Sequence, residues 1–354
     1  MPYNPDMTHI TLVLPFGLPP AALARDLLRA MRMPALATLL ARSSTATHHT
    51  SDDFAPALPH ETWLARQYGL AHDAQHSPAL AQAARQSCGL PAAEGTWFRL
   101  QPVHFHVARD HLVLTDTRLL EIPDDQSRAL FAEVFPLFEE LGMQLAYGSA
   151  HSWFVRADNW SDLQTSTADA ACGHNITIWL PKGDAARDWR RLQNEVQMTW
   201  HDGAVNRQRE QNGQPRINAL WLSGATPQAS QTNAGNQTLT PYSHISQPHD
   251  WLIGLAPAVP GAAAALLNAA PSAGLAYVDT LSQPALAGDW ADWLLRMQTC
   301  ESLWFAPLLA ALKGGQLDRL QLVLSHNTKL TELIITRQSL RKFWRAPSLS
   351  GLTI

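Results

Sequence analysis

The feature that most constrains the fold is the alternation of strand-like and helix-like segments along the chain. Residues 9–16, HITLVLPF, form a short apolar run that ends at a glycine and a Pro-Pro pair, as is typical of a buried strand. From residue 19 to residue 42 leucines recur at helical spacing, and Pro34 predicts a division into two helices. Residues 44–59 are polar and lack any period, which indicates a loop. A chain that begins in this way is expected to fold as an α/β or α+β protein.

The same two patterns continue to the end of the chain. Helical spacing recurs at residues 61–70, 78–87, 124–142, 184–211 and 289–313. Strand-like segments, alternating or uniformly apolar, occur at residues 96–116, 145–157, 217–224, 274–281, 317–325 and 329–337. The part from 96 to 157 combines strands, a hairpin and a helix with an acidic start, so an antiparallel α+β unit is expected there.

Together these segments predict a mixed sheet with flanking helices. The expected organisation is an N-terminal strand and helical region over 1–90, an α+β unit over 91–175 and an α/β unit over 176–354. Residues 225–250 consist mostly of Gln, Asn, Thr, Ser and Pro and are expected to form a flexible loop. A length of 354 residues is sufficient for two domains or one large one.

The composition limits the classes of partner. Hydrophobic residues make up 46% of the chain and charged residues 16%, which supports a folded core. The formal net charge is −4, so neither nucleic acid nor an anionic membrane is the expected partner. The three cysteines lie far apart, which argues against a disulfide framework or a zinc ribbon. Because no apolar run of about 18 residues and no signal-like leader occur, we expect a cytoplasmic protein.

A row of polar side chains near the middle of the chain is the strongest candidate for a binding site. On a helix over 187–201, four apolar side chains form one stripe: Trp189, Leu192, Val196 and Trp200. A second stripe, roughly 120° away, is polar and contains Arg190, Asn194, Gln197 and His201. The following turn and strand add further polar candidates, namely Asn206, Arg209 and Asn218.

These residue types suit the recognition of an anion or a polar loop. Amide side chains donate and accept hydrogen bonds, an imidazole titrates, and a guanidinium can hold a carboxylate or phosphate with two parallel bonds. We therefore expect the polar row to bind a small phosphorylated or carboxylate metabolite, or a protein partner. The alternative is that these side chains only form a polar face bonded to the fold.

A pair of histidines gives a second, weaker candidate. His104 and His106 would point to one face of a strand, about 7 Å apart, and could share a metal ion. Asp110 and His111 follow closely on the expected turn. The alternative is a structural or partly exposed pair without metal.

Three stretches carry a resemblance to known proteins. They are residues 180–224, which contain VNRQREQNGQPRINALWLSG, residues 96–114, which contain TWFRLQPVHFHV, and residues 303–347, which end in LRKFWRAP. This combination resembles the RpfE-type family of bacterial regulatory proteins, whose members are often described as cofactor-independent phosphoglycerate mutase-like. The first stretch is also similar to a segment of archaeal-type phosphoglycerate mutases in the alkaline phosphatase superfamily.

The resemblance implies a mutase-like scaffold, but the catalytic signals of true mutases are missing from the sequence. Those enzymes use a serine nucleophile and two divalent metals held by Asp and His side chains. Here the first strand runs into GLPP at residues 17–20 without an acid. Two functions therefore stay open. The first is a non-catalytic regulatory or ligand-binding protein, for which no cofactor is expected, and the second is an active metal-dependent mutase or phosphohydrolase.

Overall fold

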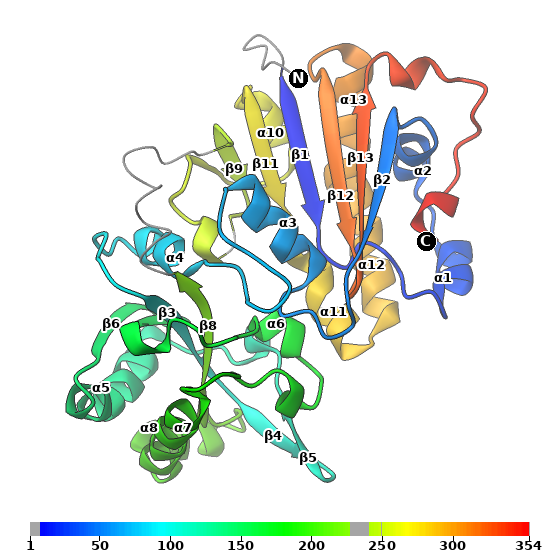
Figure 1. Ribbon diagram of the computed structural model, residues 1–354. Coiled ribbons are helices and arrows are strands. Elements are labelled where there is room, and N and C mark those ends of the chain that lie inside the picture. The colour runs from blue at the N-terminus through cyan, green and yellow to red at the C-terminus, as the bar shows by residue number, and fades with distance from the viewer. Residues whose placement is uncertain (1–7, 227–240, 249, 354) are drawn as a thin grey trace. The chain divides into compact units, whose positions relative to one another are not determined.

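A computed structural model describes residues 8–226, 241–248 and 250–353 (Figure 1). The chain forms two compact units. The split unit combines Met1–Asp53 with Thr240–Ile354, and the inserted unit consists of Phe54–Leu239. This division differs from the three consecutive regions expected from the sequence, because the first strand pairs with strands near the end of the chain.

The split unit is built on a seven-stranded mixed sheet with the order β10-β9-β11-β1-β12-β13-β2. The strands are β1 (His9–Leu14), β2 (Thr45–Thr50), β9 (His244–Ser246), β10 (Ala258–Val259), β11 (Ala273–Tyr277), β12 (Arg319–Ser325) and β13 (Lys329–Thr336). The first five strands in the sheet order are parallel, whereas β13 is antiparallel to β12, and the edge strand β2 is antiparallel to β13. A mixed sheet in an α/β fold confirms the fold class expected from the sequence.

Strand β1 lies at the centre because most of its residues are apolar, on both faces of the sheet. Leu12 is opposite Ala276 of β11 on one side and Leu322 of β12 on the other, and all three are fully buried. Parallel strands buried on both faces are the usual reason for such a continuous apolar run. The helices of the split unit are α1 (Ala24–Ala30), α2 (Pro34–Ala41), α10 (Ala263–Asn268), α11 (Ser282–Ala287), α12 (Trp290–Cys300) and α13 (Ala306–Gly314). Among them, α10 packs against β9 and α13 against β12.

The inserted unit contains a four-stranded antiparallel sheet with the order β6-β7-β3-β8, and a separate two-stranded hairpin, β4-β5 (Figure 1). The strands are β3 (Trp97–Val103), β4 (Phe105–Ala108), β5 (His111–Leu114), β6 (Gln144–Ser149), β7 (Ser152–Arg156) and β8 (Ala219–Thr226). The helices are α3 (Pro59–Gln67), α4 (Ala81–Ser87), α5 (Asp124–Glu140), α6 (Ala168–Ala171), α7 (Ala186–His201) and α8 (Ala204–Gln211). The expected antiparallel unit over 96–157, with its hairpin, is confirmed.

Aromatic side chains hold α5 and α7 on this sheet. The rings of Trp153 on β7 and Trp200 on α7 meet edge to face, with centroids 6.0 Å apart. The indole Nε1–H of Trp200 donates to the carbonyl of Leu130 on α5 at 3.1 Å. An indole that buries its ring and also satisfies its one donor stabilises both helices at once.

Two expectations about individual elements were wrong. Residues 44–59 were expected to form a loop, but Thr45–Thr50 is the edge strand β2, because its three β-branched threonines suit an extended chain. The single helix expected over 184–211 is two helices, α7 and α8, which meet at Gly203. Gly203 has an extended backbone with ψ 149°, so the helical hydrogen bonds stop there and start again. Of the expected loop over 225–250, residues 227–240 and 249 lie outside the described residues. The described part differs from the expectation where Thr226 ends β8 and His244–Ser246 forms β9.

Candidate functional site

Helix α7 carries the predicted stripes on the faces that its sequence indicates. Trp189, Leu192, Val196 and Trp200 are buried, as expected. The polar stripe faces outward: Arg190, Asn194 and His201 are exposed, and Gln197 is half-buried. These four side chains therefore lie along one accessible helix face.

Asn206 lies at the start of α8 and has a different environment. Its side chain is buried, with 1% exposed, and all of its bonds go to backbone. The amide Nδ2 donates to the carbonyls of Trp200 and Ile217 at 2.9 and 2.8 Å, and Oδ1 accepts from the N–H of Ile217 at 2.8 Å. The side-chain amide thus bonds to both the N–H and the carbonyl of Ile217, as the backbone of a neighbouring strand would. These bonds fix the position of the chain that enters β8.

Arg209 is fully buried one turn later on the same helix. Its guanidinium donates to the carbonyls of Pro215 and Leu120 at 2.7 and 2.5 Å, and to Oε1 of Gln126 at 3.0 Å. A buried cation needs such acceptors, and these come from three separate parts of the inserted unit. Arg209 therefore fastens the α8–β8 turn to the loop before α5.

Asn218 repeats the arrangement of Asn206 at the beginning of β8. Its Oδ1 accepts from the N–H of Phe105 at 2.8 Å, and its Nδ2 donates to the carbonyl of Phe105 at 2.8 Å. This pairing attaches the β4–β5 hairpin to the rest of the inserted unit. We call Asn206, Arg209 and Asn218 the backbone clamp.

The structure therefore divides the seven predicted residues into two groups. The backbone clamp bonds to the fold, which is the alternative considered for these side chains in the sequence. The four residues on the outer face of α7 (Arg190, Asn194, Gln197 and His201) remain available for a ligand. Of these, Arg190 uses its Nε to donate to the carbonyl of Ala186 at 3.2 Å, which holds its stem along the helix.

The two histidines lie together as expected. The rings of His104 and His106 are nearly parallel, with an interplanar angle of 14° and centroids 6.3 Å apart. His104 donates from Nδ1 to the carbonyl of Arg216 at 2.7 Å, and burial lowers its pKa below the ordinary value. Within the described ranges, no group of three or more His, Cys, Asp or Glu side chains is placed to hold a metal ion.

A second candidate site is the carboxyl end of the parallel strands in the split unit, because open α/β sheets usually bind their ligands there. Strand β1 ends at Leu14 and continues through Phe16 in a left-handed conformation, with φ 55°. The carbonyl of Phe16 accepts from the indole Nε1–H of Trp293 at 2.9 Å. The ring of Phe16 packs edge to face against the ring of His326, which follows β12, and the two centroids are 6.3 Å apart.

Close packing and a bond between two side chains involve further groups at this edge. A Cβ atom added at Gly17 would lie 3.0 Å from the side chains of Leu14 and Leu324. After β11, Asp279 accepts a short hydrogen bond from the hydroxyl of Ser282 at the start of α11. A two-metal phosphoryl-transfer centre needs several converging carboxylate and imidazole ligands. Among the residues that the structure describes, no three His, Cys, Asp or Glu side chains converge to form such a centre.

Sequence reasoning missed a cluster of ionisable side chains at the start of α3. Glu61 accepts from the N–H of Leu58 and from the hydroxyl of Thr167, both at 2.7 Å. Burial, and then the neighbouring carboxylate of Asp169, raise the pKa of Glu61 to about 8. The signal was present in the sequence as Pro59 followed two residues later by a glutamate, which is typical of a helix start.

Comparisons with known proteins concern the fold. No protein-family model matches the chain, and no curated protein matches it. Among solved structures, the chain is similar to the cofactor-independent phosphoglycerate mutase from Thermoplasma acidophilum DSM 1728. The identity is 15%, the match covers 98% of this chain and 94% of that one, and the TM-score is 0.46.

The chain is also similar to the PH0037 protein from Pyrococcus horikoshii. Here the identity is 12%, the match covers 93% of this chain and 87% of that one, and the TM-score is 0.50. At this identity the likeness shows a shared fold alone. In the part of the chain that the structure describes, no helix has the length and apolarity needed to cross a membrane.

Proposed function

We propose that this chain is a non-catalytic regulatory or ligand-binding protein on a phosphoglycerate mutase-like scaffold, and that it belongs to the RpfE-type family that its sequence resembles. The observation that carries the proposal is the packing at the end of β1. Phe16, Trp293 and His326 occupy the position at which an open sheet usually binds its ligand. An aromatic contact and a satisfied carbonyl there favour a structural role for that edge.

The ligand surface in this proposal is the outer face of α7. Arg190, Asn194 and His201 are exposed, and their spacing of four and seven residues aligns them on one side of the helix. A guanidinium, an amide and an imidazole at that spacing suit a small phosphorylated or carboxylate metabolite, or an acidic loop of a protein partner. A cytoplasmic location is part of the same proposal.

Thermal unfolding with added ligands tests the proposal. We expect 3-phosphoglycerate to raise the unfolding temperature without any metal, since a ligand at 100 times its dissociation constant stabilises a fold by about 2.7 kcal/mol. Mn²⁺ and Mg²⁺ alone should leave the unfolding temperature unchanged, and no mutase or phosphatase turnover should follow.

A pair of variants shows whether α7 is responsible. Arg190→Ala should abolish the shift caused by the phosphorylated acid. The matched control is Arg191→Ala, because Arg191 is an exposed neighbour whose Nε lies 3.2 Å from Oε1 of Glu195 on the same helix. Metal-dependent turnover would reject the proposal and establish the active enzyme instead. If both variants lost the shift in unfolding temperature equally, the outer face of α7 would be excluded as the ligand surface.

A further inference from the structure

The C-terminal part of the split unit displays two large aromatic side chains. Phe343 is 80% exposed and the neighbouring Trp344 is 70% exposed. The two rings meet edge to face, with centroids 5.4 Å apart. Adjacent aromatic side chains with this much exposure are unusual on the surface of a monomeric protein. They indicate a site of interaction with another protein or a membrane.

The aromatic pair lies between cations. The sequence from 341 to 345 is Arg-Lys-Phe-Trp-Arg, which we call the aromatic–basic segment. Residues 333–353 contain three arginines, one lysine and no Asp or Glu, so this part of the chain has a formal side-chain charge of +4. The expectation against an anionic membrane rested on the total charge of −4, and that total hides this local excess of positive charge.

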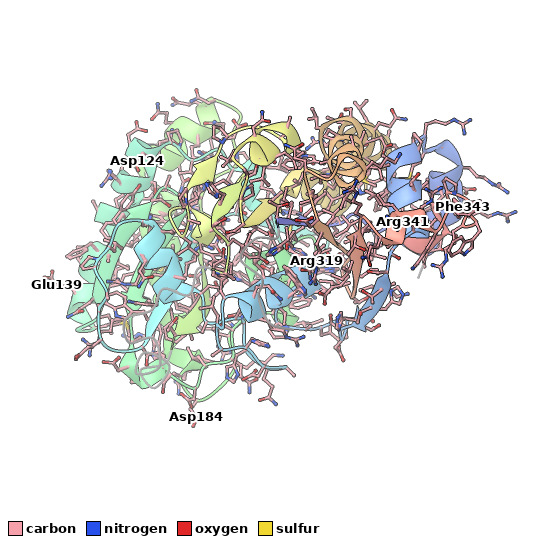
Figure 2. All side chains as sticks on the ribbon, turned by 90° about the horizontal axis from the view of Figure 1, so that it is seen from above. Asp124, Glu139, Asp184, Arg319, Arg341 and Phe343 are labelled. Carbon is pink, nitrogen blue, oxygen red and sulfur yellow. The ribbon has the colours of Figure 1, made fainter. Side chains whose placement is uncertain are left out.

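The segment is held firmly on α2 and its C-terminal turn. Lys342 donates from Nζ to the carbonyl of Ser43 at 2.8 Å, and the N–H of Ser348 donates to the carbonyl of Ala37 at 3.2 Å. Arg42 donates to the carbonyl of Leu340 at 3.2 Å. Figure 2 shows Arg341 and Phe343 close together beside the blue ribbon of the N-terminal helices. Because the backbone is fastened on both sides of the pair, the rings are presented outward in a fixed place.

We propose that the aromatic–basic segment docks this protein on an anionic lipid surface. Aromatic rings favour the headgroup level of a bilayer, where they need no pocket of matching shape. The exposed guanidinium groups of Arg341 and Arg345 meet the negative headgroups, and each contributes about fivefold to binding. One apolar contact together with a basic cluster gives reversible attachment, without a helix that crosses the membrane.

Sedimentation with lipid vesicles tests this inference. The full chain should bind vesicles of phosphatidylcholine mixed with phosphatidylserine, and should not bind vesicles of phosphatidylcholine alone. Binding should weaken with added salt, because the exposed charges are screened. Soluble glycerophosphoserine should not compete, since it carries the charge of the headgroup without a bilayer for the rings.

Matched variants assign the binding to this segment. Combined Phe343→Ala and Trp344→Ala should reduce binding at least about tenfold, and Arg341→Glu should reduce it by more than about fivefold. The controls are Leu295→Ala, since Leu295 is 63% exposed on α12, and Arg187→Glu on the exposed face of α7. Neither control should change the binding, and all variants should unfold at the temperature of the original chain.

Three results would overturn the inference. The first is that the original chain does not bind the anionic vesicles. The second is that the aromatic variant binds them as well as the original chain does. The third is that the chain binds polyglutamate but not the vesicles, which would assign the segment to an acidic protein partner.

Discussion

At the scale of single residues, the polar groups between 194 and 224 serve two purposes that the sequence does not distinguish. An asparagine that binds a ligand and an asparagine that binds backbone have the same residue type and the same helical spacing. What separates Asn206 from Asn194 is burial, since Asn206 lies against Ile217 whereas Asn194 faces outward. Burial depends on the turn that brings residues 215–218 back to α8. The spacing of residues along one helix gives no information about that turn.

Replacement of Arg209 tests the backbone clamp. Arg209→Leu should destabilise the inserted unit by about 3 kcal/mol or more, because the carbonyls of Pro215 and Leu120 lose their donors inside the protein. Urea unfolding followed by tryptophan fluorescence measures the loss. Arg187→Leu, on the exposed face of α7, should change stability by no more than about 0.5 kcal/mol. Similar losses in both variants would mean that Arg209 contributes no more than an ordinary surface arginine.

Asn206 allows a test with a nearly isosteric change. Asn206→Asp keeps the acceptor for Ile217 but places a carboxylate beside the carbonyls of Trp200 and Ile217. The folded state should therefore raise the pKa of the introduced carboxyl above its unfolded value of about 3.9. Stability should then be lost as the pH rises from about 4 to 7, by about 2 kcal/mol or more. Asn194→Asp is the exposed control, and an equal pH dependence in both variants would contradict the clamp.

At the scale of elements, the sequence predicted helices and strands well where apolar residues are buried, and poorly where tertiary contacts decide the secondary structure. The apolar stripe of α7 and the apolar run of β1 each follow from residue spacing. Strand β2 has six exposed residues, so it lacks an apolar pattern and owes its structure to hydrogen bonds from β13. The break between α7 and α8 coincides with Gly203. A glycine in the sequence does not show by itself whether a helix ends there or continues with lower stability.

The start of α3 should make stability depend on pH through Glu61. The folded state raises the pKa of this carboxyl to about 8, so the stability that the protonated group contributes is full below the unfolded pKa and is lost as the pH rises toward 8. Glu61→Gln keeps a neutral group and should remove this dependence, with a gain of about 2 kcal/mol at pH 8 relative to the original chain. Urea midpoints at several pH values measure it. Glu139→Gln, exposed on α5, should change the midpoint little at any of them.

At the scale of the whole molecule, the order of strands decides the division of the chain. The sequence predicted three consecutive regions because each stretch has its own pattern, but a pattern does not tell which strands are neighbours. Strand β1 lies between β11 and β12, whose sequence positions are more than 250 residues later. The likeness to the PH0037 protein, with a TM-score of 0.50, concerns the fold as a whole and is compatible with this arrangement.

The discontinuous division predicts which fragments fold. A polypeptide of residues 54–239 contains every partner strand of the β6-β7-β3-β8 sheet and the buried cluster around Trp153 and Trp200, so we expect it to unfold cooperatively on its own. A polypeptide of residues 1–90 contains β1 without β11 or β12, so the apolar faces of β1 lack both neighbours. It should show no cooperative transition in urea by circular dichroism. A cooperative transition in 1–90 together with none in 54–239 would contradict the division. In that case β1 would fold without β11 and β12, whereas the inserted unit would draw its stability from segments outside it.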